Sequence, residues 1–321
     1  MAFFDVFNGD ADGICALHQL RLANPVKSTL VTGIKRDIAL LSQVNANAGD
    51  EITVLDIALS KNREALLAQL ERGAKVRYFD HHIPGEIPDH PNLNTFIDTS
   101  PNVCTSLLVN RELKGQHLIW AVVAAFGDNL HESALQASEP LKLSVSQLDA
   151  LRQLGECINY NAYGESIQDL YFNPAELYQI LHRHIDPFTF IHDEPAYNTL
   201  QNGYAEDMAL ANSIHPEIST DAGEIYMLPD ASWSRRISGV FGNALATASP
   251  LKAHAVLTRL TAGGYLVSVR SPMATKAGAD VLCSQFATGG GRKGAAGINH
   301  LPENQLAHFA ELFNNTFSLK A

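Results

Sequence analysis

The stretch FNGDADGICAL (7–17) joins an apolar segment to a helical pattern. The preceding residues, AFFDVF (2–7), are apolar and aromatic enough for a short buried strand. Apolar residues then recur at helical spacing over 14–22, so the stretch predicts a strand that turns into a helix. Asp10 and Asp12 should therefore follow the carboxyl end of a strand, where open α/β sheets bind ligands. An Asx-type turn, with Asp12 capping the helix, would explain the same residues without a ligand.

The strand–helix alternation continues to about Asp128 and predicts a doubly wound parallel sheet in an α/β fold. The expected strands are FFDVF, STLVTG, ITVLDIA, AKVRYFD and NTFIDT. The expected helices are 13–23, 37–45, 60–72, 103–113 and 117–126.

The composition changes after a helical region over 145–184. Prolines within DPFTFIHDEPAYN (186–198) indicate the end of a first domain, and a mixture of strand and helix patterns follows. We expect a first domain over 1–190 and a smaller mixed α/β domain over 200–321.

Charge and composition limit the classes of partner. The net charge is −11, whereas residues 201–321 hold nine basic and nine acidic residues, so the whole excess lies in 1–200. An acidic domain does not bind a long polyanion by counterion release. The longest apolar run, LIWAVVAAFG, is too short to span a membrane. Four scattered cysteines and the lack of a signal peptide predict a cytoplasmic protein. The sequence leaves the oligomeric state open, with a homodimer as one alternative.

Acids and histidines follow several of the expected elements. Parallel strands direct their carboxyl ends to one edge, so these side chains should converge there. Each alone has a simpler explanation as a helix cap or a surface residue, but five acids together would repel one another without a cation. Carboxylates with imidazole suit Mn²⁺ or a similar divalent ion. The residues are Asp10, Asp12, Asp56, Asp80, His81, His82 and Asp128.

Four of these segments, GDADG, LD, DHH and GDN, resemble in order and spacing the motifs of the DHH phosphoesterase superfamily. Near the C-terminus, VSVRS (267–271) and GGGRKGAAG (289–297) resemble the DHH-associated domain of its RecJ-type and nano-RNase-like branches. The resemblance covers nearly the whole chain. It implies a metal-binding catalytic domain over 1–190, a substrate-binding domain over 200–321 and an active-site cleft between them. It implies two divalent cations, with manganese expected and Mg²⁺ or Co²⁺ as alternatives.

The resemblance also implies roles for individual residues. Asp10 corresponds to a ligand of the first ion and Asp12 to a ligand of the second, and Asp56 would bridge both. His81 and Asp128 would complete the second site.

Two catalytic positions follow from the same resemblance. His82 would contact the scissile phosphate, and Asp80 would orient an imidazole. The chain departs from the family at Asn8, where RecJ-type proteins carry an acid, and at Val6, where some branches carry a histidine ligand. We retain Asn8 as a tentative metal ligand, because an amide oxygen coordinates without charge.

The glycine-rich segment offers a second group of candidates. Glycines let a backbone approach a ligand closely and present its N–H groups, and neighbouring basic side chains would bind phosphate. Arg292 stands where the family commonly has histidine. A flexible connector is the alternative interpretation. The expected substrate-binding residues are Arg270, Ser271, Gly289, Gly290, Gly291, Arg292 and Lys293.

These features together predict a manganese-dependent hydrolase, a phosphodiesterase of the oligoribonuclease or exonuclease type. Its substrates would be short single-stranded oligonucleotides or linear dinucleotides. Two alternatives stay open. One is a catalytically weak or inactive nucleotide-binding regulatory module, and the other is a single-strand exonuclease.

Overall fold

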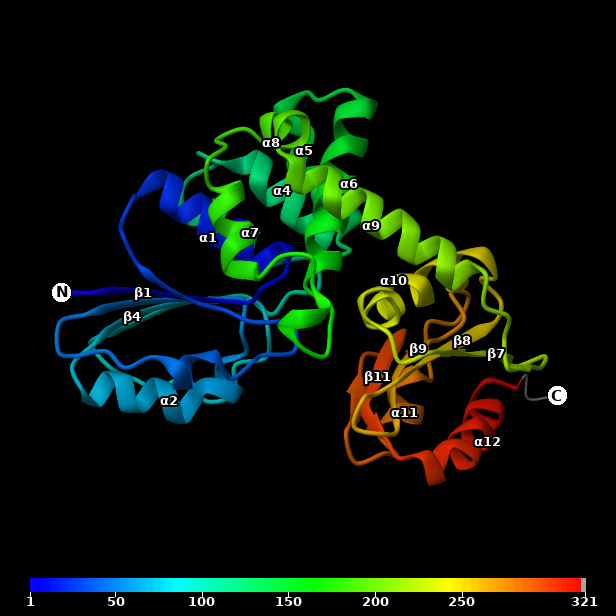
Figure 1. Ribbon diagram of the computed structural model, residues 1–321. Coiled ribbons are helices and arrows are strands. Elements are labelled where there is room, and N and C mark those ends of the chain that lie inside the picture. The colour runs from blue at the N-terminus through cyan, green and yellow to red at the C-terminus, as the bar shows by residue number, and fades with distance from the viewer. Residues whose placement is uncertain (319–321) are drawn as a thin grey trace. The chain divides into compact units, whose positions relative to one another are not determined.

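The computed structural model describes residues 1–318 and divides into two compact units, Met1–Asn202 and Gly203 to the C-terminus. The division falls within a long helix, α9 (Pro195–Asn212). Figure 1 shows the chain with its elements labelled.

The first unit is built on a five-stranded sheet in which every neighbouring pair is parallel. The spatial order is β2-β1-β3-β4-β5, so the order reverses between β1 and β3. This confirms the predicted parallel sheet. The strands are β1 (Phe3–Phe7), β2 (Thr29–Val31), β3 (Glu51–Leu55), β4 (Lys75–Asp80) and β5 (Leu93–Ile97).

Helices cover both faces of this sheet because both faces are apolar. Val6, Val54 and Tyr78 pack toward the face covered by α2 (Leu59–Glu71). The residues that follow them in sequence, such as Phe7 and Leu55, join the opposite core under α1 (Ala11–Ala23), α3 (Thr105–Glu112) and α4 (Leu118–Gly127). In Figure 1, α1 and α2 lie on opposite sides of the sheet. The sheet is therefore doubly wound, as predicted.

The expected helix over 37–45 is wrong. Only a 3-10 helix, Leu40–Gln43, forms there. The Asn62 side chain accepts from the Leu41 N–H and donates to the Ile38 carbonyl. These bonds take backbone groups that a longer helix would need.

The rest of the first unit is helical. No helix in the part of the chain that the structure describes, 1–318, is long and apolar enough to cross a membrane. The helices are α5 (His131–Ser138), α6 (Val145–Asn161), α7 (Pro174–Leu181), α8 (Pro187–Asp193) and α9, with short 3-10 turns at Glu139–Leu141 and Ile167–Asp169.

The second unit has a six-stranded mixed sheet of order β10-β11-β9-β8-β7-β6, in which only β7 and β8 pair in parallel. Figure 1 shows α10 on one face of this sheet and α11 and α12 on the other. Its strands are β6 (Ile218–Ser219), β7 (Gly223–Leu228), β8 (Ala253–Arg259), β9 (Tyr265–Arg270), β10 (Gly289–Gly291) and β11 (Ala295–Leu301). Its helices are α10 (Ser232–Ala248), α11 (Ala279–Cys283) and α12 (Leu306–Phe317), with a 3-10 turn at Glu303–Gln305.

Two glycines let three helices of the first unit cross closely. A Cβ at Gly127 would lie 2.4 Å from the Ala11 Cβ, and a Cβ at Gly155 would lie 2.2 Å from the Val123 carbonyl oxygen. This crossing fixes the end of α4, from which Asp128 follows, beside the start of α1.

We expect Gly155→Ala to destabilise the protein by about 1–3 kcal/mol, because the methyl group collides with backbone. The control is Gly242→Ala in α10, where the nearest atom to the new Cβ is 3.6 Å away. That substitution should stabilise its helix by up to about 1 kcal/mol. Urea unfolding monitored by circular dichroism distinguishes the two, and equal effects would contradict the close crossing.

Candidate metal centre and active site

Asp10 begins the site as the N-cap of α1. Its Oδ1 accepts from the backbone N–H of Asp12 at 3.0 Å and of Gly13 at 3.1 Å. A Cβ at Gly13 would lie only 2.1 Å from the Asn8 carbonyl oxygen, which explains the glycine in GDADG. The capping residue is thus Asp10, whereas the simpler interpretation assigned that role to Asp12.

Asp12 projects from the first turn of α1 toward the start of α3. Its two oxygens accept from the backbone N–H of Thr105 and of Ser106, both at 2.7 Å. The side chain is buried, and the positive end of α3 stabilises its charge.

Asp56 follows β3 in a left-handed backbone conformation, with φ of 60°. A non-glycine residue seldom adopts this conformation unless its surroundings enforce it. Its Oδ1 accepts from the Thr105 hydroxyl at 3.0 Å and lies 3.4 Å from the His81 Nε2. Asp10 and Asp56 therefore flank the point between β1 and β3 where the strand order reverses, a common ligand position in such sheets.

The geometry around His81 fixes which of its nitrogens carries a proton. Nδ1 lies 2.8 Å from the Val103 carbonyl oxygen, which only accepts, so Nδ1 is the donor. In the neutral ring, the lone pair of Nε2 then faces Asp56 and Asp128, whose oxygens are 3.4 and 4.0 Å away. Metal-binding histidines typically use their second nitrogen in this way.

His82 is held by a different contact. Its Nδ1 lies 2.7 Å from Oδ1 of Asp80, which is fully buried. Burial alone would lower the pKa of His82, but the hydrogen bond to Asp80 and the surrounding acids raise it above its ordinary value. His82 is more exposed than His81, with 44% against 11% of the side chain accessible, so it is the histidine open to a substrate.

Two acids at this edge, Asp56 and Asp128, have too little positive charge nearby to offset their burial. Burial, and then the charges of Asp12 and Asp10, raises the pKa of Asp56 well above its ordinary value. Burial also raises the pKa of Asp128 to about 6, with Asp12 and Asp10 adding to the effect and Lys35 opposing it.

Two overlapping groups at this edge could hold a divalent cation. Asp12, His81 and Asp128 form one group, and Asp56, His81 and His82 form the other. Within each group the potential ligand atoms lie within 4.8 Å of one another. Carboxylate oxygens with one lone-pair imidazole fit a manganese-like ion. The donor set therefore suits the metal that the sequence predicts.

Lys35 is a charged neighbour that the sequence interpretation missed. Its Nζ pairs with Oδ2 of Asp10, lies 3.1 Å from the Asn159 Oδ1 and 4.0 Å from Oδ1 of Asp128. Its ammonium also lies over the Tyr163 ring, 5.5 Å from the centroid. The sequence could have indicated this residue, because Lys35 follows β2 at the same carboxyl edge of the sheet as the acids.

The Asn8 side chain is occupied by backbone contacts. Its Oδ1 accepts from the Asp10 N–H at 3.2 Å, and its Nδ2 donates to the Lys35 carbonyl oxygen at 3.3 Å. The oxygen that the sequence interpretation offered to a metal thus holds the Asp10 turn.

The candidate substrate-binding residues of the second unit lie in two places, at the end of β9 and in the glycine-rich segment. Arg270 donates to Oδ1 of Asn243 at 2.6 Å, to the Ser268 hydroxyl at 2.9 Å and to the Gly239 carbonyl oxygen at 3.1 Å. Ser271 is buried, and its hydroxyl donates to the Gly294 carbonyl oxygen at 3.3 Å. Both side chains thus make contacts within their own unit.

The glycine-rich segment is a β-hairpin. Gly289, Gly290 and Gly291 form β10, which pairs with β11. The Arg292 N–H donates to the Ala295 carbonyl oxygen, and the reverse bond closes a tight turn. Arg292 and Lys293 are exposed at this turn. The hairpin thus presents two cations on an ordered support.

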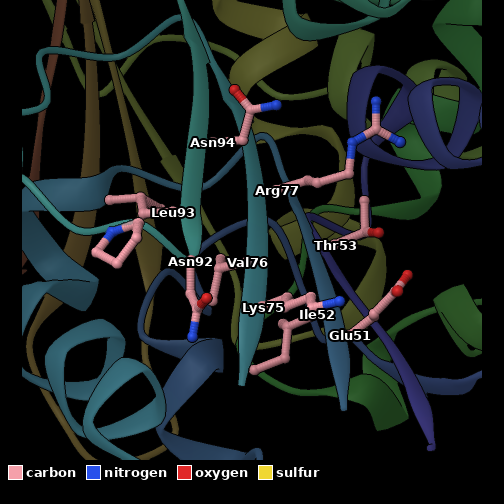
Figure 2. Close-up of a pocket in the computed structure, with 10 residues that line it drawn as sticks. Glu51, Ile52, Thr53, Lys75, Val76, Arg77, Asn92, Leu93 and Asn94 are labelled. Carbon is pink, nitrogen blue, oxygen red and sulfur yellow. The ribbon is translucent and has the colours of Figure 1, made fainter. Parts of the chain in front are cut away.

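A cavity of about 280 Å³ in the first unit lies away from this site. Figure 2 shows it at the amino-terminal half of the sheet, with Thr53, Lys75 and Arg77 on neighbouring strands. The acids described above follow the opposite ends of these strands. Arg77 pairs with Glu112 at 3.3 Å and lies over the Phe79 ring, so it already has partners.

Comparison with solved structures places the fold among known ones. The chain is similar to a crystal structure of the exonuclease RecJ bound to manganese, with a TM-score of 0.60 and 15% identity over 98% of this chain and 89% of that chain. It is also similar to RecJ from Thermus thermophilus in complex with Mn²⁺, with a TM-score of 0.56 and 14% identity over 98% of this chain. The chain spans about half (51%) of that Thermus protein. No family model matches the sequence, and no curated relative matches it.

At these identities the comparisons establish the fold. The first unit, with its parallel sheet, and the second unit, with its mixed sheet, have the fold of RecJ. The fold that the motifs predicted is therefore confirmed.

We expect Asp128→Asn to stabilise the metal-free protein at pH 7.5 by on the order of 1–2 kcal/mol. A carboxyl whose pKa is raised in the folded state costs stability that grows as the pH rises from its ordinary pKa of 3.8 through about 6. The gain should therefore disappear below about pH 4.

Thermal unfolding with chelator, repeated between pH 4 and 8, measures this effect. Added Mn²⁺ should stabilise the wild type more than Asp128→Asn. The matched control is the exposed Asp89→Asn, which should follow the wild type at every pH. If Asp128→Asn stabilised the protein by the same amount at every pH, the gain in stability would not come from removing the ionised carboxylate.

Proposed function

We propose that this protein is a manganese-dependent phosphodiesterase that hydrolyses short oligonucleotides or linear dinucleotides. The observation that carries the proposal is the orientation of His81. Its Nδ1 is bound to a backbone carbonyl, and its Nε2 lies near carboxylates from three other segments. Such a convergence has no evident structural purpose, because it raises the pKa values of Asp56 and Asp128.

Some of these residues would bind the cation, and others would contact the substrate. Asp12, His81 and Asp128 would hold the divalent ion, and Asp56 would contact it from the β3 side. The ion would supply Lewis acidity at the reacting phosphate. His82, oriented by Asp80 and with its pKa raised, would donate a hydrogen bond from Nε2 to a phosphate oxygen or a proton to the leaving oxygen.

The solved structures support the metal and the class of reaction. The RecJ neighbours are named as an exonuclease and as complexes with manganese, and their fold covers 98% of this chain. Manganese also fits the mixture of carboxylates and imidazole better than magnesium, which prefers oxygen ligands alone.

The charge distribution favours short substrates. All of the net charge of −11 lies in residues 1–200, and the remainder is balanced. We infer that a few local contacts, with Arg292 and Lys293 foremost, bind substrate phosphate in place of a long basic channel. The four cysteines are buried free thiols, which supports a reducing compartment such as the cytoplasm.

The test offers purified protein and Mn²⁺ a labelled ladder of one to twenty nucleotides in RNA and DNA, together with a linear dinucleotide and pyrophosphate. We expect chelator-sensitive hydrolysis that is fastest on dinucleotides and the shortest oligomers. Faster cleavage of long single strands would favour the exonuclease. Binding without cleavage of any substrate would favour the regulatory module and overturn the proposal.

His82→Ala serves as the internal control for this assay. We expect kcat to fall by about 10²–10⁴ with metal content unchanged, because the variant loses the contact to substrate and retains the metal ligands. Equal loss of bound manganese and activity would make His82 a ligand and contradict its assigned role.

We expect Arg292→Ala to lower kcat/KM for a 5′-phosphorylated dinucleotide by about ten- to a hundredfold, the value of one arginine–phosphate contact. A nitrophenyl phosphodiester lacks the second phosphate and should be hydrolysed at the wild-type rate. Lys276→Ala, also exposed in the second unit, is the control. Equal slowing of both substrates would show that the hairpin supports the catalytic site or the fold.

A further inference from the structure

The pairing of Lys35 with Asp10 bears on how many metal ions this site holds. Lys35 comes from the segment after β2, and its Nζ contacts Oδ2 of Asp10 and Oδ1 of Asn159. The side chain is 26% exposed, and its backbone is fixed because the Lys35 N–H donates to the Ala162 carbonyl oxygen at 2.9 Å. Its ammonium therefore has an ordered position among the acids.

A cation beside Asp10 would meet this ammonium. The Asp10 Oδ1 already accepts two backbone N–H bonds, and Oδ2 faces Lys35. The neighbouring Asn8 brings no charge, and both of its polar atoms are used by backbone. A divalent ion beside Asp10 would have Oδ2 of Asp10 as its carboxylate ligand. Because that oxygen already pairs with the Lys35 ammonium, the ion would be repelled by a positive charge within hydrogen-bonding distance of its ligand.

On the other side of the site Lys35 is less close, because its Nζ pairs with Asp10 and lies 4.0 Å from Oδ1 of Asp128. Asp12 is held by the N–H groups of Thr105 and Ser106, which carry no full charge, and lies with His81 and Asp128 in a group of potential ligands. Asp56 adjoins the same His81 nitrogen. One divalent ion can therefore bind there while Lys35 stays beside Asp10.

We propose that this protein holds one resident divalent cation at Asp12, Asp56, His81 and Asp128, and that the Lys35 ammonium takes the place of a second ion beside Asp10. The proposal rests on the metal site of the proposed function and changes its stoichiometry. One divalent ion and one ammonium supply three positive charges against the four carboxylates of Asp10, Asp12, Asp56 and Asp128, since the fifth acid, Asp80, is paired with His82. A second ion would add two more, which leaves an excess of positive charge.

The test measures manganese bound to the full-length protein. Wild type, Lys35→Met and Arg36→Met are dialysed against Mn²⁺, the bound metal is counted by mass spectrometry, and Mn²⁺ spin coupling is recorded by electron paramagnetic resonance. We expect one uncoupled ion per chain in the wild type and two coupled ions in Lys35→Met. Arg36→Met removes the adjacent, exposed cation and should retain one ion.

Asp10→Asn provides a second variant if Lys35→Met folds poorly. Since Asp10 pairs with Lys35, this variant should still bind one ion, whereas a two-ion site would lose one. Two coupled ions in the wild type, or a single ion in well-folded Lys35→Met, would overturn the proposal. A wild type without bound manganese would overturn the proposed function as well, and normal binding of two ions would overturn only the role of Lys35.

Discussion

The electrostatic repulsion among buried carboxylates at one edge of the parallel sheet is the constraint on which the rest of the site depends. Asp10, Asp12 and Asp56 are each at most 3% exposed, and Asp128 joins them from α4. The doubly wound topology brings them together, because β1 and β3 are neighbours and their carboxyl ends meet at the reversal of strand order. Each acid then needs a donor or cation of its own.

The chain meets that need in different ways for different acids. The start of α1 stabilises Asp10, and the start of α3 stabilises Asp12. Asp56 accepts from the Thr105 hydroxyl and lies beside the His81 ring, while burial and the charges of Asp12 and Asp10 raise its pKa strongly. The acids with the poorest local compensation are thus those grouped around His81, where a divalent ion would be stabilised most.

The sequence predicted those elements that have a local, repeated pattern of residues. Alternating strands and helices indicated the parallel sheet, and acids at strand ends indicated the convergence of Asp10, Asp56 and His81. What it could not predict depends on contacts between distant segments. Asn62 binds backbone groups that the helix expected over 37–45 would need, and Lys35 contacts Asp10 from the segment after β2. The hairpin at 289–297 was also hidden, because three glycines carry no strand pattern and gain their structure by pairing with β11.

Lys35 also affects the pKa values of the neighbouring acids in the metal-free protein. Although burial alone would lower the pKa of Lys35, its contact with Asp10 raises it well above the ordinary value, so the lysine stays charged. The same contact holds the pKa of Asp10 below its ordinary value despite burial. Asp10 can therefore remain ionised without a metal, whereas Asp56 and Asp128 tend to bind protons. Below about pH 6, a cation that enters the site must displace the proton of Asp128. Metal affinity should then rise with pH through the pKa of Asp128, about 6, while the start of α1 stays formed whether or not metal is bound.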